Sequence, residues 1–322
     1  METVSIQKVC SILCEHDDFL IFTHQKPDGD TVGSAFALMF ALRSMGKRAD
    51  VFDGGDIPQK YDYFTQYEKI GITPQNATLV AVDIAASGML SDKAKEYKDD
   101  FYLSIDHHAF STPFAKYNYE NSNAAANCEN IYEIINALNL DITTPVANAL
   151  YTGIATDTGC FMYSNTSPLT HLIAAELIGK GIDFAEINRK MFECKQKNRI
   201  ELEKAAWQTL EISHGGLIAT VAVTREMFEK AGANDDDFEG LTSISRSVDG
   251  IKIGLTVREN ENGDFKCSLR SYPPIDSTVI AASFGGGGHI RAAGCTINGT
   301  LETVKKQLLD RCEQELKKQG LL

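Results

Sequence analysis

Three apolar stretches of this sequence end in aspartate or histidine, and this repeated pattern constrains the fold more than any other feature. The clearest stretch, Phe101–Ile105, leads directly into Asp106, His107 and His108. A short apolar run of this kind is typical of a buried strand in a parallel sheet. In open α/β sheets, ligands bind beyond the carboxyl ends of the strands. We therefore expect these polar side chains to gather at one edge of a sheet.

The other parts of the pattern lie on both sides of this segment. Residues 19–23 lead into His24, which is followed by Asp28 and Asp30, and residues 77–82 lead into Asp83. A further acid, Asp157, stands among small residues in the stretch 153–159. We expect all four places to converge into one cluster of histidine and aspartate.

Strands and helices alternate over the first part of the chain, which predicts an α/β fold with a mostly parallel sheet and helices on both faces. After residue 213 the periodicity changes, and a hairpin turn at residues 259–264 indicates a smaller second α/β domain. We place a catalytic domain at 1–194, a linker helix at 195–213 and a substrate-binding domain at 214–322, with the active-site cleft between the two domains. Strands are expected at 18–24, 49–52, 77–83, 101–106, 217–223, 251–258 and 265–270. Helices are expected at 2–16, 33–46, 91–98, 124–138, 145–156, 168–179, 184–192, 194–210, 276–283 and 301–318.

Charge and composition exclude several classes of protein. The 322 residues carry a formal net charge of −13, which argues against a long, non-specific nucleic-acid track, because such binding depends on clustered Lys and Arg. The first residues show no secretory signal, and no apolar run approaches the ~20 residues needed to span a bilayer. The eight cysteines include no Cys-x-x-Cys pair, so neither a zinc ribbon nor a disulfide framework is predicted. We expect a cytoplasmic protein that does not bind membranes.

Oxygen and nitrogen ligands without thiolate suit Mn²⁺, Mg²⁺ or iron rather than structural zinc. The candidates are too many for one ion and would serve two, with one bridging carboxylate: His24, Asp28, Asp30, Asp83, His107 and Asp157. Two ions ~3.5–4 Å apart activate water and stabilise the oxygens of an in-line displacement at phosphorus. The sequence thus predicts hydrolysis of a phosphoester.

Each piece also has a purely structural interpretation. Asp28 and Asp30 could form a turn, Asp83 could cap a helix, and Asp157 could simply end one. The histidine pair after Asp106 is harder to explain, because burying several titratable groups without a metal or partner is costly. Taken together, the pieces favour a site.

A glycine run, Gly285–Gly288, stands before His289 late in the chain. A dinucleotide-binding fingerprint would need a strand before the glycines and a helix after them, whereas this run follows a helix-like segment. A flexible linker is disfavoured by the apolar residues on both sides. We expect a backbone nest that holds a phosphate or a base.

These residues resemble the DHH phosphoesterase family over nearly the whole chain. His24-x-x-x-Asp28-x-Asp30 resembles its first motif, Asp83 its second, Asp106-His107-His108 its third and Asp157 its fourth. The run 285–289 with residues 292–294 resembles the signature of the DHH-associated C-terminal domain. The short two-domain form is similar to bacterial nanoRNase/pAp phosphatases and to stand-alone phosphodiesterases for cyclic di-AMP or its linear product pApA.

The resemblance implies ligands for two metal ions. Mn²⁺ is the expected ion, and Mg²⁺ is the alternative. One ion would be held by His24, Asp28 and Asp83. The other would be held by Asp30, Asp83, His107 and Asp157, so that Asp83 bridges. His108 would lie beside the scissile phosphate, and Asp106 would orient a histidine.

In the second domain, the resemblance implies contacts to another phosphate or to the base from Arg270, His289, Gly286, Gly287, Gly288 and Ser268. Arg246 and Arg258 would be weaker contacts. The sequence departs from the family pattern at Met162, where relatives often carry a basic residue. A phosphate contact from this position is therefore left open.

The function implied is a manganese-dependent phosphohydrolase of short oligoribonucleotides and 3′-phosphoadenosine 5′-phosphate (pAp). The sequence leaves cyclic di-AMP and pApA open as substrates, and a homodimer open as the assembly. A manganese pyrophosphatase would share only the first domain, and a RecJ-like exonuclease for long single strands is disfavoured by the acidic charge. A nucleotide-binding protein without catalytic activity is the alternative from another class.

Overall fold

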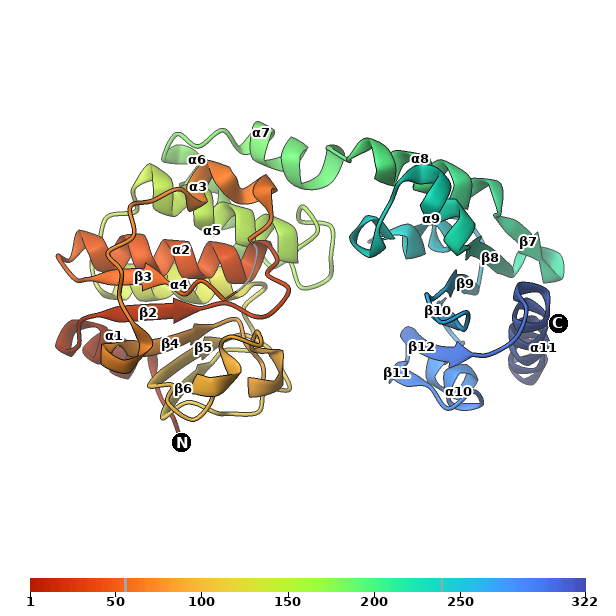
Figure 1. Cartoon of the computed structure of the whole chain (residues 1–322), viewed down its shortest axis with the longest axis horizontal. Helices are drawn as coiled ribbons and strands as arrows, with labels where there is room; N and C mark the ends of the chain where they lie inside the picture. Colours follow the sequence, from red (N-terminus) through yellow and green to blue (C-terminus); the bar gives the residue numbers. More distant parts are fainter. Residues whose placement is uncertain (55–56, 239) are drawn as a thin grey trace. The chain divides into compact units, whose positions relative to one another are not determined.

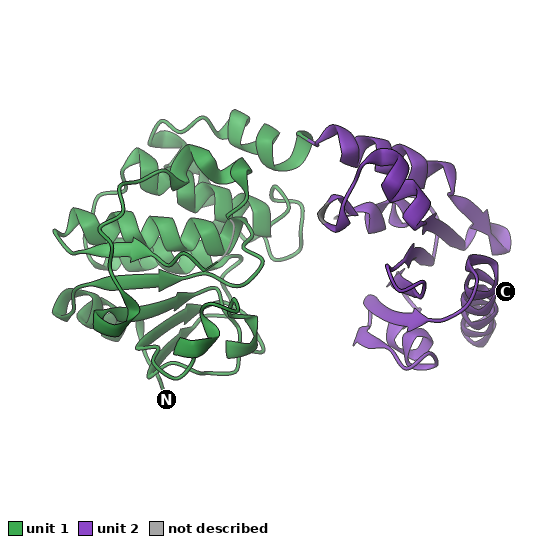
Figure 2. Cartoon of the chain, in the orientation of Figure 1, with its two compact units in different colours: residues 1–194 green, residues 195–322 purple. Residues whose placement is uncertain are grey.

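The chain forms two compact units, Met1–Cys194 and Lys195–Leu322 (Figure 2). The computed structural model describes residues 1–54, 57–238 and 240–322.

The first unit is built on a six-stranded sheet in which every neighbouring pair of strands is parallel (Figure 1). The strand order is β1-β6-β5-β4-β2-β3. The predicted parallel α/β architecture is therefore confirmed. The strands are β1 (Glu2–Thr3), β2 (Phe19–Phe22), β3 (Ala49–Val51), β4 (Thr78–Val82), β5 (Leu103–Asp106) and β6 (Tyr117–Glu120). Two of them, β1 and β6, were not expected, because neither contains an apolar run.

Helices cover one face of this sheet. Alternate strand residues such as Phe19 and Ile21 are fully buried in the core that the helices α1, α2, α4 and α5 share with the sheet. The predicted ends of α6, Pro168 and Gly179, are confirmed. The helices are α1 (Ile6–Glu15), α2 (Gly29–Ser44), α3 (Asp62–Thr65), α4 (Asn127–Ala137), α5 (Thr144–Asp157), α6 (Pro168–Gly179) and α7 (Phe184–Asn188).

The other face of the sheet is covered by the segment 84–101 and by residues that follow β5. Leu20 and Phe22 pack there against Leu90 and Phe101. The helix expected at 91–98 is wrong, since only short 3-10 turns form, at 87–89 and 95–97. The stretch has too few apolar residues to give a helix an apolar stripe, so it packs through isolated side chains instead.

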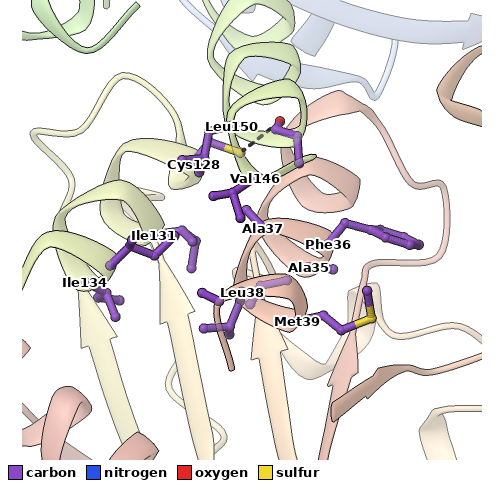
Figure 3. Packing of buried hydrophobic residues seen from close by; sticks show 14 of the residues in the cluster. Ala35, Phe36, Ala37, Leu38, Met39, Cys128, Ile131, Ile134, Val146 and Leu150 are labelled. Carbon is purple, nitrogen blue, oxygen red and sulfur yellow. Dashed lines mark hydrogen bonds between the residues drawn. The ribbon is translucent and has the colours of Figure 1, made fainter. Parts of the chain in front are cut away.

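Close contact between α2 and α5 depends on glycine. A Cβ atom on Gly33 would lie 2.4 Å from the carbonyl oxygen of Ala149, and one on Gly153 would lie 2.2 Å from the Cys128 Sγ. Figure 3 shows the small and branched side chains that fill the rest of this contact among α2, α4 and α5. The glycines therefore let the first turn of α2 approach the end of α5.

The second unit contains a mixed six-stranded sheet of order β11-β12-β10-β9-β8-β7. The pair β8–β9 is parallel and the other pairs are antiparallel. The predicted hairpin is confirmed as β9–β10, while β7, β11 and β12 were not expected. The strands are β7 (Glu211–Ser213), β8 (Ile218–Val223), β9 (Ile253–Glu259), β10 (Phe265–Ser271), β11 (Gly287–His289) and β12 (Ala292–Ile297).

Helices pack on both faces of this second sheet. On one face, α10 (Ser277–Ala282) and α11 (Leu301–Lys318) bury Leu255 and Leu269. On the other face, α8 (Lys197–Gln208), α9 (Arg225–Ala231) and the 3-10 helix 241–246 pack against β8. The segment expected to link the domains thus contains a helix, α8, that packs as part of the second unit.

None of the helices in the described part of the chain combines the length and the apolar composition needed to cross a lipid bilayer.

We expect Gly153→Ala to destabilise the first unit, because its methyl group would lie 2.2 Å from Cys128 Sγ and 2.9 Å from Asp30 Oδ1. Overpacking of this kind costs roughly 1–3 kcal/mol, which corresponds to about 2–12 °C in Tm for a domain of this size. Thermal unfolding followed by circular dichroism measures the change. Gly179→Ala is the control, because no atom lies within 4 Å of its added Cβ; equal Tm values for the two variants would contradict the expectation.

Candidate metal centre

The turn between β2 and α2 supplies the first two polar side chains. Asp28 is the N-cap of α2, and its Oδ1 accepts hydrogen bonds from the backbone N–H groups of Asp30 at 3.1 Å and Thr31 at 3.2 Å. The same oxygen lies 3.6 Å from His24 Nε2. Burial opposes ionisation of Asp28, but His24 and the two N–H donors hold its pKa below the usual value. Asp28 therefore caps the start of α2 and also faces His24.

Asp30 lies in the first turn of α2 and is 1 % exposed. Its carboxylate accepts hydrogen bonds from the backbone N–H groups of Asn127 at 2.5 Å and Cys128 at 2.8 Å, at the start of α4. Such N–H groups have no partner within their own helix and favour an anion. Burial nevertheless raises the pKa of Asp30, and the neighbouring Asp28 carboxylate adds to this rise.

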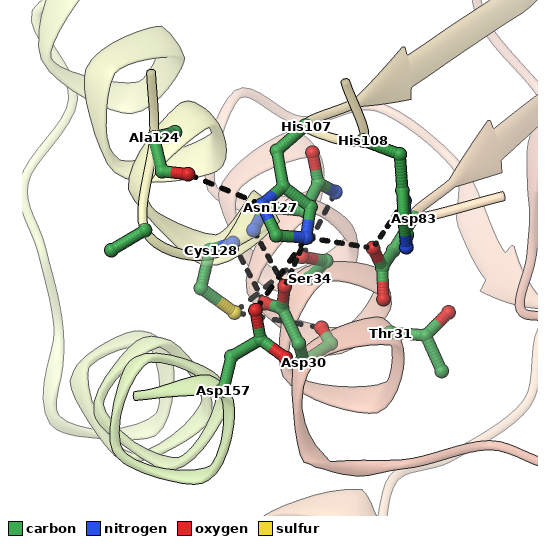
Figure 4. A network of polar contacts seen from close by, with 12 residues as sticks. Asp30, Thr31, Ser34, Asp83, His107, His108, Ala124, Asn127, Cys128 and Asp157 are labelled. Carbon is green, nitrogen blue, oxygen red and sulfur yellow. Dashed lines mark hydrogen bonds and ion pairs between the residues drawn. The ribbon is translucent and has the colours of Figure 1, made fainter. Parts of the chain in front are cut away.

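Asp83 follows β4, and Figure 4 shows its carboxylate beside His107. It is 3 % exposed and has a φ of +58°, a left-handed conformation that aspartate tolerates better than most residues. Its Oδ2 lies 3.9 Å from His24 Nε2, and its Oδ1 lies 3.5 Å from His107 Nε2. Burial raises its pKa well above the usual value, and the charge of Asp30 raises it further. The two oxygens of one carboxylate thus face two different histidines.

His107 follows β5 and is oriented through its other ring nitrogen. Its Nδ1 lies 3.2 Å from the carbonyl oxygen of Ala124, so Nδ1 carries the proton and Nε2 offers a lone pair. Nε2 lies 3.7 Å from Asp30 Oδ2, 3.5 Å from Asp83 Oδ1 and 3.6 Å from Asp157 Oδ2. One imidazole nitrogen therefore points into a group of three carboxylates.

Asp157 is the last residue of α5. Burial and the nearby charge of Asp30 raise its pKa to about 7. The Asn165 side chain holds this end of the helix by donating to the carbonyl oxygens of Asp157 at 3.1 Å and Ala125 at 2.9 Å.

These side chains form groups whose ligand atoms all lie within 4.8 Å of one another. Asp83 Oδ1 is buried and has no hydrogen-bond partner among the described residues. A buried, unpartnered carboxylate oxygen and several raised carboxyl pKa values are unfavourable alone, but they fit a bound cation, whose charge would offset them. The groups are His24, Asp28 and Asp83; Asp30, His107 and Asp157; and Asp83, His107 and His108.

His108 differs from the other histidines because its Nδ1 already has a close partner. Asp106 Oδ1 lies 2.8 Å from this nitrogen, whereas Asp83 Oδ1 lies 3.6 Å away. The hydrogen bond to Asp106 raises the pKa of His108. Asp106 is itself buried, yet its hydrogen bonds with His108 and with the Ser111 hydroxyl lower its pKa. This arrangement suits a histidine that donates a proton better than one that binds a metal through Nδ1.

A buried network of amide side chains supports the cluster, and the sequence did not reveal it. Asn130 Nδ2 donates to the Asp106 carbonyl oxygen at 3.2 Å and to Asn127 Oδ1 at 3.1 Å. Asn127 Nδ2 donates to Ser34 Oγ at 3.1 Å. Two asparagines three residues apart at the start of α4 were the available sequence signal.

The second unit places four of its six predicted residues on one face of its sheet, while Gly288 pairs on the opposite face and Gly286 precedes the strand. His289 and Arg270 both pair with Ala292, and Gly287 and Ser268 both pair with Gly294. Residues paired directly across strands share a face of a sheet. This face is opposite the one that packs on α10 and α11, where Leu269 is buried.

The glycine run does not form the expected nest, because Gly287–His289 is the extended strand β11. A Cβ atom on Gly286 would lie 2.1 Å from the Gly294 carbonyl oxygen, and one on Gly288 would lie 2.6 Å from the Ala292 carbonyl oxygen. These glycines therefore allow an edge strand to lie closely against β12.

Arg258 was predicted as a weaker contact, but it has a structural role. Arg258 lies 2.5 Å from Asp235 and stacks against Phe228 and Phe238, so it stabilises the second unit instead of facing a ligand. Met162 is 77 % exposed and offers no charge.

Arg270 has another arginine as its neighbour. Burial lowers the pKa of Arg270, and the positive charge of Arg246 lowers it further. Two guanidinium groups close together are suited to an anion such as a phosphate.

Comparisons with known proteins agree with this division of the chain. Residues 18–154 match the model for the DHH family, N-terminal domain, and residues 215–318 match that for the DHHA1 domain. The bifunctional oligoribonuclease and PAP phosphatase NrnA of Thermus thermophilus is 34 % identical over 310 residues, which cover 94 % of this chain and 91 % of that protein. The Bacillus subtilis protein of the same name is 25 % identical over 285 residues, or 88 % of this chain and 90 % of that protein.

A solved structure is also similar over most of its length. The crystal structure of an exopolyphosphatase-related protein from Bacteroides fragilis aligns with a TM-score of 0.83 and 25 % identity, covering 96 % of this chain and 95 % of that chain.

The raised carboxyl pKa values predict how the metal-free protein responds to pH. Such groups contribute stability below their unfolded value of about 4, and this contribution is lost as the pH rises through the folded value, about 7 for Asp157. The Tm of the metal-free protein should therefore fall between these two pH values. Excess Mn²⁺ should abolish this fall, which differential scanning calorimetry can measure.

The Asp83→Asn variant tests whether ionisation of one buried carboxyl group lowers the stability of the metal-free protein. Above pH 7 without metal, it should raise Tm by roughly 2–4 °C for each kcal/mol of repulsion removed, because a buried carboxylate beside Asp30 is lost. With excess Mn²⁺ the order should reverse, since the variant lacks a ligand and gains less from binding. Asp99→Asn, at an exposed site, is the control; equal Tm values for both variants in both conditions would refute the assignment.

Proposed function

Because the chain belongs to the DHH family of phosphoesterases, we propose that it hydrolyses short oligoribonucleotides and pAp with the help of two divalent metal ions. The observation that carries this proposal is the position of Asp83. Its two carboxylate oxygens face separate groups of ligands, as a bridging carboxylate would.

The ligands divide between the two ions in a simple way. His24, Asp28 and Asp83 Oδ2 would hold one ion, and Asp30, His107, Asp157 and Asp83 Oδ1 would hold the other. A histidine in each group favours Mn²⁺ over Mg²⁺, which prefers oxygen ligands. When bound, the ions supply water activation and charge stabilisation of the phosphoryl oxygens.

The protein's own residues supply the proton for the leaving group. Asp106 holds His108 Nδ1, so Nε2 is the atom that can donate a proton to the leaving oxygen. Ser111 and Asn130 fix Asp106, which keeps the imidazole in one orientation. A water oxygen forms the new bond to phosphorus and loses its proton to solvent, while the bond from phosphorus to the leaving oxygen breaks. That oxygen takes the proton of His108, which becomes neutral.

The second unit carries positive charge that suits an anionic substrate. Arg270 and Arg246 provide positive charge for a phosphate in a chain whose net charge is −13. A few placed cations in an acidic protein suit a small substrate better than a long strand. The names of the Thermus and Bacillus relatives support short oligoribonucleotides and pAp, and cyclic di-AMP and pApA remain the alternative substrates of the same chemistry.

Hydrolysis can be tested directly with protein that has been freed of metal by EDTA. Adding Mn²⁺ should restore release of phosphate from pAp and of mononucleotide from a diribonucleotide, measured by chromatography. Cyclic di-AMP and pApA in the same series would rank the alternatives. Asp83→Asn should stay at background, and Asp99→Asn should equal the wild type; no turnover of any of these compounds by metal-loaded protein would refute the proposal.

His108→Ala should lower kcat by roughly 10²–10⁴-fold, the usual contribution of a general acid. The rate should fall as the pH rises through the pKa of His108, because only the protonated imidazole donates. Since Asp106 raises this pKa, Asp106→Asn should move the alkaline limb of the kcat profile to lower pH. An unmoved limb would show that His108 is not the proton donor.

A further inference from the structure

The ring of Phe110 is 92 % exposed, and none of the other large apolar side chains that the structure describes is more exposed. A single apolar residue on a surface needs no explanation by itself. Phe110, however, stands two residues after His108, in the segment that carries the proposed catalytic groups. Its position therefore raises the question of what the ring contacts.

The backbone on the C-terminal side of Phe110 is tied to the cluster. The Ser111 hydroxyl donates to the Asp106 carboxylate and lies 3.1 Å from the His108 carbonyl oxygen. The N–H of Thr112 donates to the Ala85 carbonyl oxygen at 2.7 Å, two residues after Asp83. These bonds fix where the chain presents the ring.

The ring is within reach of a substrate beside His108. Residues two apart have Cα atoms separated by at most about 7 Å. A nucleobase is joined to its phosphate through a single ribose, so base and phosphate are separated by a comparable span. The base next to a phosphate beside His108 is therefore within the span that separates His108 from Phe110.

We propose that Phe110 stacks on the nucleobase next to the scissile phosphate, which makes it a specificity-determining residue of the proposed hydrolase. The inference rests on the proposed function and adds that the site selects phosphoesters that carry a base. Stacking on an aromatic ring reads the π-face common to all bases and so tolerates any sequence. The contact also needs no positive charge, which suits an acidic chain.

Tyr163 shows why Phe110 is the better candidate. Tyr163 is also exposed, at 59 %, and follows the ligand Asp157 by six residues. Its ring, however, lies over Gly159, where an added Cβ would be 2.4 Å from the ring. Tyr163 thus packs within the chain, so its exposure is weaker evidence for a contact with the substrate.

The test compares substrates with and without a base. Steady-state KM and kcat are measured with Mn²⁺ for pAp and for ribose 3′,5′-bisphosphate, its base-free counterpart. Phe110→Ala should raise the KM for pAp about 5- to 100-fold, as expected for the loss of one stacked base. The KM for the base-free compound and both kcat values should stay unchanged. Phe110→Trp should keep the low KM for pAp.

Leu172→Ala is the matched control, because Leu172 is 68 % exposed on α6, outside the segments that carry the cluster. It should change neither KM. Equal changes in KM for both compounds, or no change for either, would overturn the stacking proposal while leaving hydrolysis intact. A change in sedimentation of Phe110→Ala without a change in the KM ratio would likewise overturn it, because the ring would then contact a second copy.

Binding measurements test the stacking proposal separately from the proposed hydrolysis on which it rests. If the wild type hydrolyses neither compound, the proposed function fails. Calorimetry with adenosine 5′-monophosphate and ribose 5-phosphate then decides stacking alone. Tighter binding of the nucleotide that is lost in Phe110→Ala supports it, and equal binding of the two compounds overturns it.

Discussion

The structure of the first unit depends on holding several carboxylates close together inside the protein. Asp30 and Asp83 are almost fully buried, and burial raises the pKa of both. The charge of Asp28 raises the pKa of Asp30 further, and the charge of Asp30 does the same for Asp83. Such an arrangement opposes folding unless other groups compensate. The N–H groups at the start of α4 compensate Asp30 in part, but Asp83 Oδ1 has no hydrogen-bond partner in the described chain. The cluster therefore costs stability, and its side chains are of the kind that could hold a cation.

The scaffold meets this constraint by bringing backbone elements unusually close. Gly33 and Gly153 allow α2 and α5 to touch, so that Asp30 at the start of one helix and Asp157 at the end of the other both face His107. The parallel sheet supplies the remaining groups, because β2, β4 and β5 all end at the same edge. The small residues between the helices and the polar side chains at the strand ends thus form the cluster together.

Much of this could be predicted from the sequence because the signals are local. Strands that run into Asp83 or Asp106 show in the sequence as apolar runs ending in acids, and α6 carries its own start and stop residues. The strands β1, β6 and β11 could not be predicted, because their pairing depends on partners far away in the chain. The seven histidines and aspartates of the centre were named from motifs, whereas the asparagines that orient them make contacts that only the folded backbone defines.

The glycine run of the second unit matches a known motif, but the backbone geometry expected from it is wrong. Glycines in a row suggest a nest because they allow unusual backbone angles, yet here Gly286 and Gly288 are needed for the close approach of β12. The consequence for binding is favourable, since small residues opposite Ser268 and Arg270 leave those side chains uncovered by their cross-strand neighbours. This face of the sheet thus presents an arginine and a histidine, which are side chains suited to a phosphate or a base.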